Sequence, residues 1–247
     1  MITTANTESP VVLVPGYWLG SWAWETVSEH LRHKGHQTYP ITLPGLESPA
    51  TERAGMRFAD HVSAVSACVR AVGDAVVLVA HSGAGAVVTA VLDAVPHLVS
   101  RVIYLDSGPA SQGAVPRPDV GPDVVELPLP PFAELEASGA SLDGLDGATL
   151  QRFRDNAVPH PAGAVREPIQ LVNPARHAVP ATIICCSFPS TTVKELVASG
   201  DPMFAAIAEL RDVTYLDLPT GHWPMWSHPA ETADVLSRAA RDRTRLI

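Results

Sequence analysis

The stretch AVVLVAHSGAGAVVTAVL, residues 75–92, decides the fold, because an apolar run changes there into a helix-forming segment of small residues without a linker. The change falls at Ser82, and Ala or Gly occupies positions 80 and 83 to 85. A serine on a tight strand-to-helix turn stands clear of the sheet, and small neighbours let the backbone turn beneath it. The pattern predicts a nucleophile elbow with Ser82 as the nucleophile. The alternative is a serine that only caps the helix.

A second motif lies far along the chain, where the apolar run VTYLDLP at 213–219 precedes TGHWPMWSHPA at 220–230. This order is typical of a strand, a loop and a closing helix, and it places His222 on the loop. A loop histidine is free to approach a serine hydroxyl and take its proton as a general base. The presence of His222 therefore favours the nucleophile interpretation of Ser82.

The three motifs of the chain resemble those of the α/β-hydrolase superfamily, and more closely its branch of plant methylesterases, hydroxynitrile lyases and small bacterial esterases. The first is the entry VVLVPGYWLGSWAWE at 11–25, the second is the elbow HSGAG at 81–85, and the third is the ending GHWPMWSHPAE at 221–231. The resemblance covers nearly the whole chain in order. It implies an α/β-hydrolase fold, with a mostly parallel central sheet flanked by helices and a lid inserted after the family's sixth strand.

The resemblance also implies an oxyanion hole at the first strand and the elbow. Its donors are expected to be the backbone N–H groups of Tyr17 and Gly83. Pro15 departs from the branch, which usually has histidine before the glycine. We expect Tyr17, Trp18 and Trp223 to bind substrate, and the alternative for Tyr17 is an aromatic of the core or pocket wall.

The acid that should orient His222 departs from the family pattern. The branch carries it after the strand matched here by ATIICCSFPSTTVKE at 181–195, where Phe188 or Pro189 stands instead. We predict that Asp106, at the end of the run RVIYLD, replaces it, because some α/β-hydrolases take the acid from the neighbouring strand and the order Ser, Asp, His is preserved. The alternatives are a structural role for Asp106 in its turn, other carboxylates, or no acid at all. Those other carboxylates are Glu195 and Asp217.

The length of 247 residues fits one domain, 1–247, and allows a sizeable core. The strand and helix alternation breaks in the segment 109–180, which holds twelve of the 23 prolines. We therefore expect a core of 1–109 and 181–247 with a cap or lid at about 110–180. The alternative is a loosely ordered surface excursion.

The regular parts of the chain alternate between β-rich apolar runs and helix-like segments, as in parallel α/β sheets. Strands are predicted at 11–14, 37–43, 75–81, 101–106, 181–186 and 213–218. Helices are predicted at 21–34, 57–72, 83–94, 191–198, 202–210 and 229–242, with two more in the lid at 132–138 and 147–156.

Charge and composition exclude several function classes. A formal net charge of -9 argues against nucleic acid and anionic membranes as partners, because both need a basic face. The start MITTANTESP shows no secretory signal, and no apolar run of about 18 residues predicts a membrane span. We expect a cytoplasmic protein whose three cysteines are reduced thiols, with an oligomeric state that the sequence does not specify.

Cofactor and metal sites are not indicated. His30, His33 and His36 recur every third residue, but the spacing crosses Gly35, and we expect a solvated helix end rather than a metal site. The elbow glycines do not form the dinucleotide fingerprint G-x-G-x-x-G, so no cofactor is predicted.

The sequence thus predicts a serine hydrolase that cleaves a small, mostly apolar carboxylic ester or lactone through an acyl-enzyme on Ser82. Two alternatives remain open. One is elimination like that of the hydroxynitrile lyases, which use an active-site lysine, whereas this chain has only Lys34 and Lys194. The other is a non-hydrolytic ligand-binding module on the same scaffold.

Overall fold

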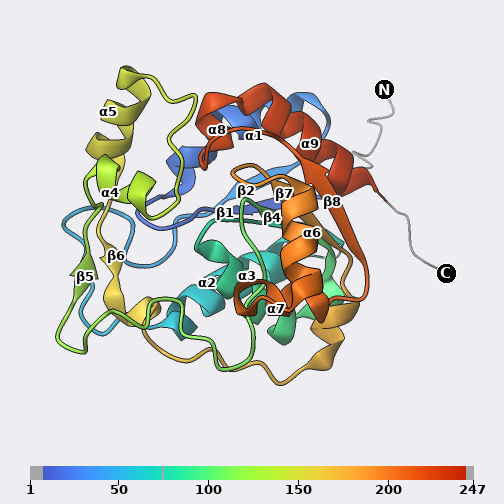
Figure 1. Ribbon diagram of the computed structural model, residues 1–247, viewed down its shortest axis with the longest axis horizontal. Helices are drawn as coiled ribbons and strands as arrows, with labels where there is room; N and C mark the ends of the chain where they lie inside the picture. Colours follow the sequence, from blue (N-terminus) through green and yellow to red (C-terminus); the bar gives the residue numbers. More distant parts are fainter. Residues whose placement is uncertain (1–7, 74, 243–247) are drawn as a thin grey trace.

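A six-stranded parallel sheet forms the centre of the computed structural model, which describes residues 8–73 and 75–242 (Figure 1). The strands in spatial order are β2 (Thr38–Pro40), β1 (Val11–Val14), β3 (Val76–His81), β4 (Val99–Leu105), β7 (Ala181–Cys185) and β8 (Val213–Asp217). All neighbouring pairs are parallel, so the carboxyl ends of the strands share one edge of the sheet. The predicted parallel α/β architecture is confirmed.

Helices cover both faces of the sheet (Figure 1). One face carries α1 (Glu25–His33), α8 (Pro224–Ser227) and α9 (Pro229–Arg241). The other carries α2 (Phe58–Val72), α3 (Ala84–Ala94), α6 (Ser190–Ser199) and α7 (Ala205–Ala208). Short 3₁₀ turns complete the framework at η1 (Ser21–Trp24), η2 (Pro96–Leu98) and η5 (Pro202–Phe204).

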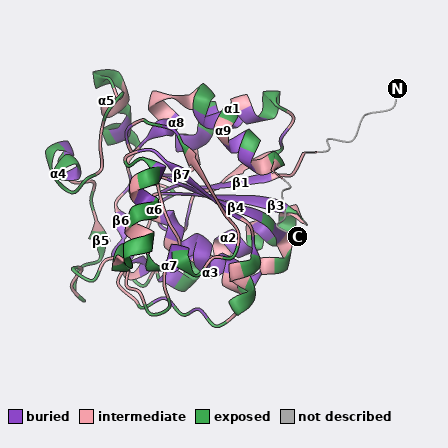
Figure 2. Cartoon of the chain, turned by 45° about the vertical axis from the view of Figure 1, so that its right-hand side comes forward, coloured by how far each residue is buried: buried purple, intermediate pink, exposed green. Residues whose placement is uncertain are grey.

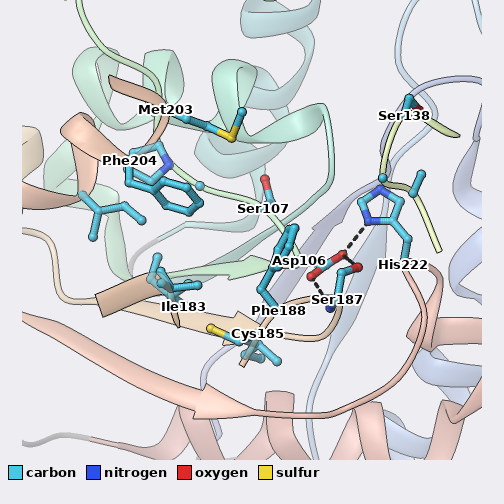
Figure 3. Close-up of a pocket in the computed structure, with 17 residues that line it drawn as sticks. Asp106, Ser107, Ser138, Ile183, Cys185, Ser187, Phe188, Met203, Phe204 and His222 are labelled. Atoms are coloured by element: carbon cyan, nitrogen blue, oxygen red, sulfur yellow. Dashed lines mark hydrogen bonds and ion pairs between the residues drawn. The ribbon is translucent and has the colours of Figure 1, made fainter. Parts of the chain in front are cut away.

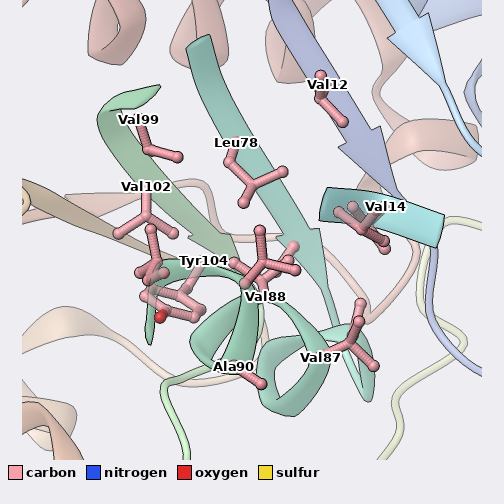
Figure 4. Close-up of a cluster of buried hydrophobic side chains, with 14 of the residues drawn as sticks. Val12, Val14, Leu78, Val87, Val88, Ala90, Val99, Val102 and Tyr104 are labelled. Carbon is pink, nitrogen blue, oxygen red and sulfur yellow. The ribbon is translucent and has the colours of Figure 1, made fainter. Parts of the chain in front are cut away.

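The central strands are buried on both faces, which explains why their sequences are continuous apolar runs instead of alternating patterns. Val12 and Leu78 point into the core beneath α2 and α3, whereas Val11 and Val77 point to the α1 and α9 side. Figure 4 shows the first of these cores, with Leu78 near Val88 of α3. Figure 2 shows the buried sheet between helices whose outer surfaces are exposed.

Most predicted element bounds agree with the structure to within two residues, and three differ more. The strand expected at 37–43 is only Thr38–Pro40, because this is an edge strand that ends at a proline. The helix expected at 21–34 starts as the 3₁₀ turn η1 before α1, and the one expected at 202–210 is divided into η5 and α7.

The segment between β4 and β7 carries the irregular part of the fold. It contains β5 (Glu126–Leu127) antiparallel to β6 (His160–Pro161), helices α4 (Phe132–Ala137) and α5 (Gly147–Asn156), and turns η3 (Ala162–Ala164) and η4 (Pro174–Ala178). Phe153 of α5 is fully buried, with its ring 5.2 Å from Trp223 and 4.9 Å from Trp226. A lid is expected after the family's sixth strand, whereas this segment follows β4, which is fourth in chain order here.

The expectation that His36 belongs to a solvated helix end is wrong. His36 is buried, and its ring forms hydrogen bonds with the Ser237 hydroxyl at 2.9 Å and the Ser9 carbonyl at 3.2 Å.

The expectation of no secretory signal concerns mainly residues 1–7, which lie outside the described residues. Within the described chain, no helix combines the length and apolarity that crossing a membrane requires. Cys68, Cys185 and Cys186 are free thiols.

Candidate active site

Ser82 sits on the turn between β3 and α3, at the carboxyl edge of the sheet. Its φ of 53° lies in the left-handed region, which costs a non-glycine residue about 1–3 kcal/mol and persists only where the surroundings enforce it. Two contacts hold the turn. The Ser82 N–H donates to the Leu105 carbonyl at 3.3 Å, and the Ser107 hydroxyl donates to the Ser82 carbonyl at 2.6 Å. The backbone therefore presents the Ser82 side chain above the sheet.

The structure brings Ser82, His222 and Asp106 into one hydrogen-bonded chain. His222 Nε2 lies 2.7 Å from Ser82 Oγ, and His222 Nδ1 lies 2.5 Å from Asp106 Oδ2. An ionised carboxylate only accepts hydrogen bonds, so Nδ1 carries the proton and Nε2 is left to accept from the serine hydroxyl. The geometry is that of a nucleophile, a base and an orienting acid.

The other candidate acids lie elsewhere. Asp217 at the end of β8 accepts from the Ser190 N–H at 2.6 Å and the Ser190 hydroxyl at 2.7 Å, so it holds the start of α6. Glu195 is exposed on α6. Of the carboxylates considered from the sequence, the structure places Asp106 alone against His222 within the described chain.

Asp106 is held by more donors than the sequence suggested. Its Oδ1 accepts the N–H groups of Cys186 at 3.1 Å and Ser187 at 2.9 Å. Its Oδ2 accepts the Ser187 hydroxyl at 2.6 Å, and Figure 3 shows Ser187 beside Asp106. Burial opposes ionisation of this carboxyl, but the bonds from His222 and Ser187 outweigh burial and lower its pKa to about 2. Asp106 therefore stays charged at neutral pH.

Replacing Ser187 by alanine is expected to lower the free energy of unfolding at pH 7 by about 1.5–3 kcal/mol, because a hydrogen bond to a charged group is lost. The folded pKa of Asp106, about 2, lies below its ordinary value of 3.8. Stability from the ionised carboxylate is thus present above pH 3.8 and disappears as the pH falls toward 2. The difference between Ser187→Ala and wild type should shrink over that range in urea unfolding curves, whereas a gap that stays constant to pH 2 would contradict the link.

The expected oxyanion donors lie next to Ser82. Among the described residues, no hydrogen bond joins the N–H group of Tyr17 or Gly83 to another backbone group outside the helices and strands. The Tyr17 ring covers Gly83 so closely that a Cβ there would lie 2.5 Å from ring carbon Cε1. The Tyr17 ring also lies 4.6 Å from that of His160. Burial raises the pKa of Tyr17 to about 12, so its hydroxyl is neutral.

Two contacts fix the loop that carries His222. The buried His81 ring donates from Nε2 to the His222 carbonyl at 2.8 Å, and burial lowers the pKa of His81 to about 3, which keeps the ring neutral. From the segment between β4 and β7, the Ser141 carbonyl accepts the His222 N–H at 2.8 Å. Only glycine fits at position 221, because a Cβ there would lie 2.5 Å from the Asp143 carbonyl oxygen. His81 and Ser141 were not assigned these roles from the sequence, since neither contact follows from local spacing.

A cavity of about 540 Å³ opens in front of Ser82, and we call it the serine chamber. The three side chains expected at the substrate, Tyr17, Trp18 and Trp223, all line it. Sequence reasoning missed two charged residues in its wall, Arg117 and Glu134. Sequence spacing does not indicate these two positions. They lie far along the chain from Ser82 and His222, and only the fold of the segment between β4 and β7 brings them to the site.

The groups that other chemistries would need lie away from this chamber. Lys34 forms an ion pair with Asp234, and Lys194 lies over the Tyr215 ring, 5.0 Å from its centre. Neither lysine lines the serine chamber. Among the described residues, no group of three or more His, Cys, Asp or Glu side chains is placed to hold a metal ion.

The sequence matches the model of one protein family over most of its length. A model of the alpha/beta hydrolase family matches residues 11–235. The chain belongs to the alpha/beta hydrolase family. This membership confirms the superfamily and fold class predicted from the three motifs.

Relatives of this alpha/beta hydrolase include named esterases. The chain is 28% identical over 246 residues to a carbendazim hydrolyzing esterase from Nocardioides sp. (strain SG-4G), which covers 92% of this chain and 97% of the relative. An extracellular alpha/beta-hydrolase from a Paenibacillus species superposes with a TM-score of 0.75 at 19% identity, covering 95% of this chain and 100% of the other. A methylesterase from Arabidopsis superposes with a TM-score of 0.68 at 20% identity, covering 94% and 98%. The family match and the esterase relative confirm the predicted class, a carboxylesterase-type alpha/beta hydrolase.

Proposed function

We propose that this alpha/beta hydrolase cleaves a small, mostly apolar carboxylic ester or lactone through an acyl-enzyme on Ser82. The observation that carries the proposal is the continuous chain from Ser82 Oγ to His222 at 2.7 Å and from His222 to Asp106 at 2.5 Å. The name of the Nocardioides relative, a carbendazim hydrolyzing esterase, supports the same reaction class.

The first half of the reaction forms the acyl-enzyme. Ser82 Oγ attacks the substrate carbonyl carbon while His222 Nε2 takes the hydroxyl proton, and Asp106 stabilises the imidazolium that results. The carbonyl oxygen becomes an oxyanion, to which the N–H groups of Tyr17 and Gly83 donate. Collapse of this intermediate breaks the bond to the alcohol oxygen, which receives the proton from His222.

The second half releases the acid. A water molecule gives a proton to His222 Nε2 and attacks the acyl carbon, and the second oxyanion uses the same two N–H donors. Its collapse breaks the bond to Ser82 Oγ, which recovers the proton from His222. The acid product keeps the water oxygen, and the site returns to its starting protonation.

The segment at about 110–180 is proposed to act as the cap of this site. It contributes Arg117 and Leu127 to the serine chamber, and the Trp18 indole donates to the Leu127 carbonyl at 2.9 Å. The bond from His222 N–H to Ser141 ties the same segment to the base. Such a wall excludes bulk water, which strengthens the electrostatic interactions around the developing oxyanion.

A fluorophosphonate probe tests the proposal directly, because it phosphonylates an activated serine and mimics the tetrahedral intermediate. Peptide mapping after labelling should place one adduct on Ser82, and prior labelling should abolish turnover of p-nitrophenyl butyrate. An unlabelled, folded protein without turnover on short or medium acyl esters would contradict the proposal. Labelling should also vanish after heat unfolding, since activation depends on His222 being in place.

Two observations weigh against the alternative functions. The elimination mechanism of the resembling lyases needs a lysine, and neither Lys34 nor Lys194 reaches the serine chamber. A ligand-binding module has no need of a strained serine held against a base and an acid, yet Ser82 has a φ of 53°. Hydrolysis accounts for both the strain and the hydrogen-bonded chain.

A further inference from the structure

A second cavity, of about 370 Å³, adjoins the serine chamber, and we call it the side chamber. The two cavities share three lining residues, Ser138, Ala140 and His222. Of these two cavities, Ser82 and Tyr17 line the serine chamber and not the second one. The imidazole that is proposed to move the proton thus borders both cavities, whereas the nucleophile borders one.

The walls of the side chamber are largely apolar. β7, α6 and the η5 to α7 region contribute Ile183, Val193, Phe204 and Ile207, and Figure 3 shows Ile183 and Phe204 across Asp106 from His222. Two of its polar side chains already have partners, because the Ser107 hydroxyl donates to the Ser82 carbonyl and the Ser187 hydroxyl donates to Asp106. A ligand in this cavity would therefore meet mainly apolar surface.

The rim of the side chamber is an independent sign of an apolar ligand. Phe188 and Met203 line it, and they are 53% and 82% exposed. Large apolar side chains with this exposure are few among the described residues, and two of them border one cavity. Exposed apolar surface that gathers around a concave site marks a binding region.

We propose that the side chamber binds the alcohol portion of the ester and that the preferred substrate carries a bulky apolar alcohol. The inference rests on the proposed function. In the tetrahedral intermediate, the oxyanion faces Tyr17 and Gly83, and the leaving oxygen must lie beside His222 to receive its proton. The group on that oxygen then extends from His222 into the side chamber, while the acyl group stays in the serine chamber.

Two isomeric esters test this assignment, because they carry the same ring on opposite sides of the ester bond. Cyclohexyl acetate places the ring on the alcohol, and methyl cyclohexanecarboxylate places it on the acyl group. Wild type is expected to hydrolyse cyclohexyl acetate with at least tenfold higher kcat/KM, since even one methylene in a fitting apolar pocket gives about 10- to 200-fold discrimination. Equal values, or a preference for the acyl isomer, would overturn the assignment.

Ile207→Trp fills the side chamber from α7 and should lower kcat/KM for cyclohexyl acetate at least tenfold more than it lowers kcat/KM for methyl acetate. Val172→Trp is the control, because Val172 is 83% exposed and lines neither chamber. If Ile207→Trp does not fold, Met203→Asp at the exposed rim replaces it, with Val172→Asp as its matched control. Equal losses on both acetates, or no loss on either, would overturn the proposal.

A binding measurement separates failure of this inference from failure of the proposed function. Saturation-transfer NMR should detect cyclohexanol bound to the wild type and to Ser82→Ala, and the signal should fall at least threefold in the side-chamber variant. If the protein hydrolyses no ester but still binds cyclohexanol in this way, the proposed function fails and the apolar alcohol site stands. Ester hydrolysis without cyclohexanol binding would overturn the side chamber as an alcohol site and leave the proposed function intact.

Discussion

Replacing Ser82 by alanine is expected to lower kcat for p-nitrophenyl butyrate by about 10⁶-fold, because removing the nucleophile of a serine, histidine and aspartate unit costs about that much. The remaining rate would come from substrate binding and the two oxyanion N–H groups, which the substitution leaves in place. The measurement is a comparison of initial rates at saturating ester, with active-site titration of the wild type to set the enzyme concentration.

The matched control is Ser199→Ala, which removes an exposed hydroxyl at the end of α6 that donates to the Leu196 carbonyl. It should keep full activity, and circular dichroism should show that both variants are folded. A Ser82→Ala protein that is folded and retains more than about one per cent of wild-type kcat would sink the acyl-enzyme mechanism. In that case water would attack the ester directly, with His222 as its base.

The positions of Ser82 and His222, the proposed nucleophile and base, were predictable from local sequence for a physical reason. The small residues around Ser82, at the end of an apolar run, allow a tight turn between strand and helix. Such a turn places the serine hydroxyl above the sheet. His222 follows the last apolar run, which forms a strand. The carboxyl ends of all strands in a parallel sheet lie at one edge, so His222 is expected at the same edge of the sheet as Ser82. Chain order and parallel topology together were enough to bring residues far apart in sequence to one place.

The surroundings of Asp106 were predictable only in part. Phe188 and Pro189 stand where the family carries its acid, so the acid was predicted at the end of the neighbouring strand, where Asp106 lies. The sequence did not reveal that Ser187, from the very loop that lacks the acid, donates to Asp106 through its hydroxyl at 2.6 Å and its N–H at 2.9 Å. Hydrogen bonds of this kind depend on how two loops pack against each other in the folded protein. The periodicity of the sequence does not predict that packing.

The division of the site into two chambers was likewise hidden from the sequence. Phe153, from the segment that is expected to form a cap or lid, is fully buried. The backbone path of this segment decides where Ser138 and Ala140 border both cavities, and that path follows from tertiary contacts such as the bond between Ser141 and His222. Apolar composition can favour burial of a segment, but it does not specify the shape of the space beneath it.

Asp106→Asn is expected to lower kcat about 10⁴-fold while the fold stays intact, because an amide is nearly the same shape as the carboxylate but cannot carry its charge. An asparagine that presents its NH₂ group to His222 Nδ1 makes that nitrogen an acceptor and moves the ring proton to Nε2. The base would then have no free lone pair for the Ser82 hydroxyl. The loss should appear in kcat at saturating ester, with little change in the binding of cyclohexanol or another unreactive alcohol.

Asp217→Asn is the matched control, since Asp217 also lies at a strand end and also accepts from a serine N–H and hydroxyl, at 2.6 and 2.7 Å. It should keep kcat within about twofold even if it lowers the thermal midpoint. The pair separates the two roles of a strand-end aspartate: holding a turn, and holding a histidine. If Asp106→Asn were as active as Asp217→Asn, His222 would have to be oriented by its backbone anchors at His81 and Ser141 alone, and the protein would work as a serine and histidine pair without an acid.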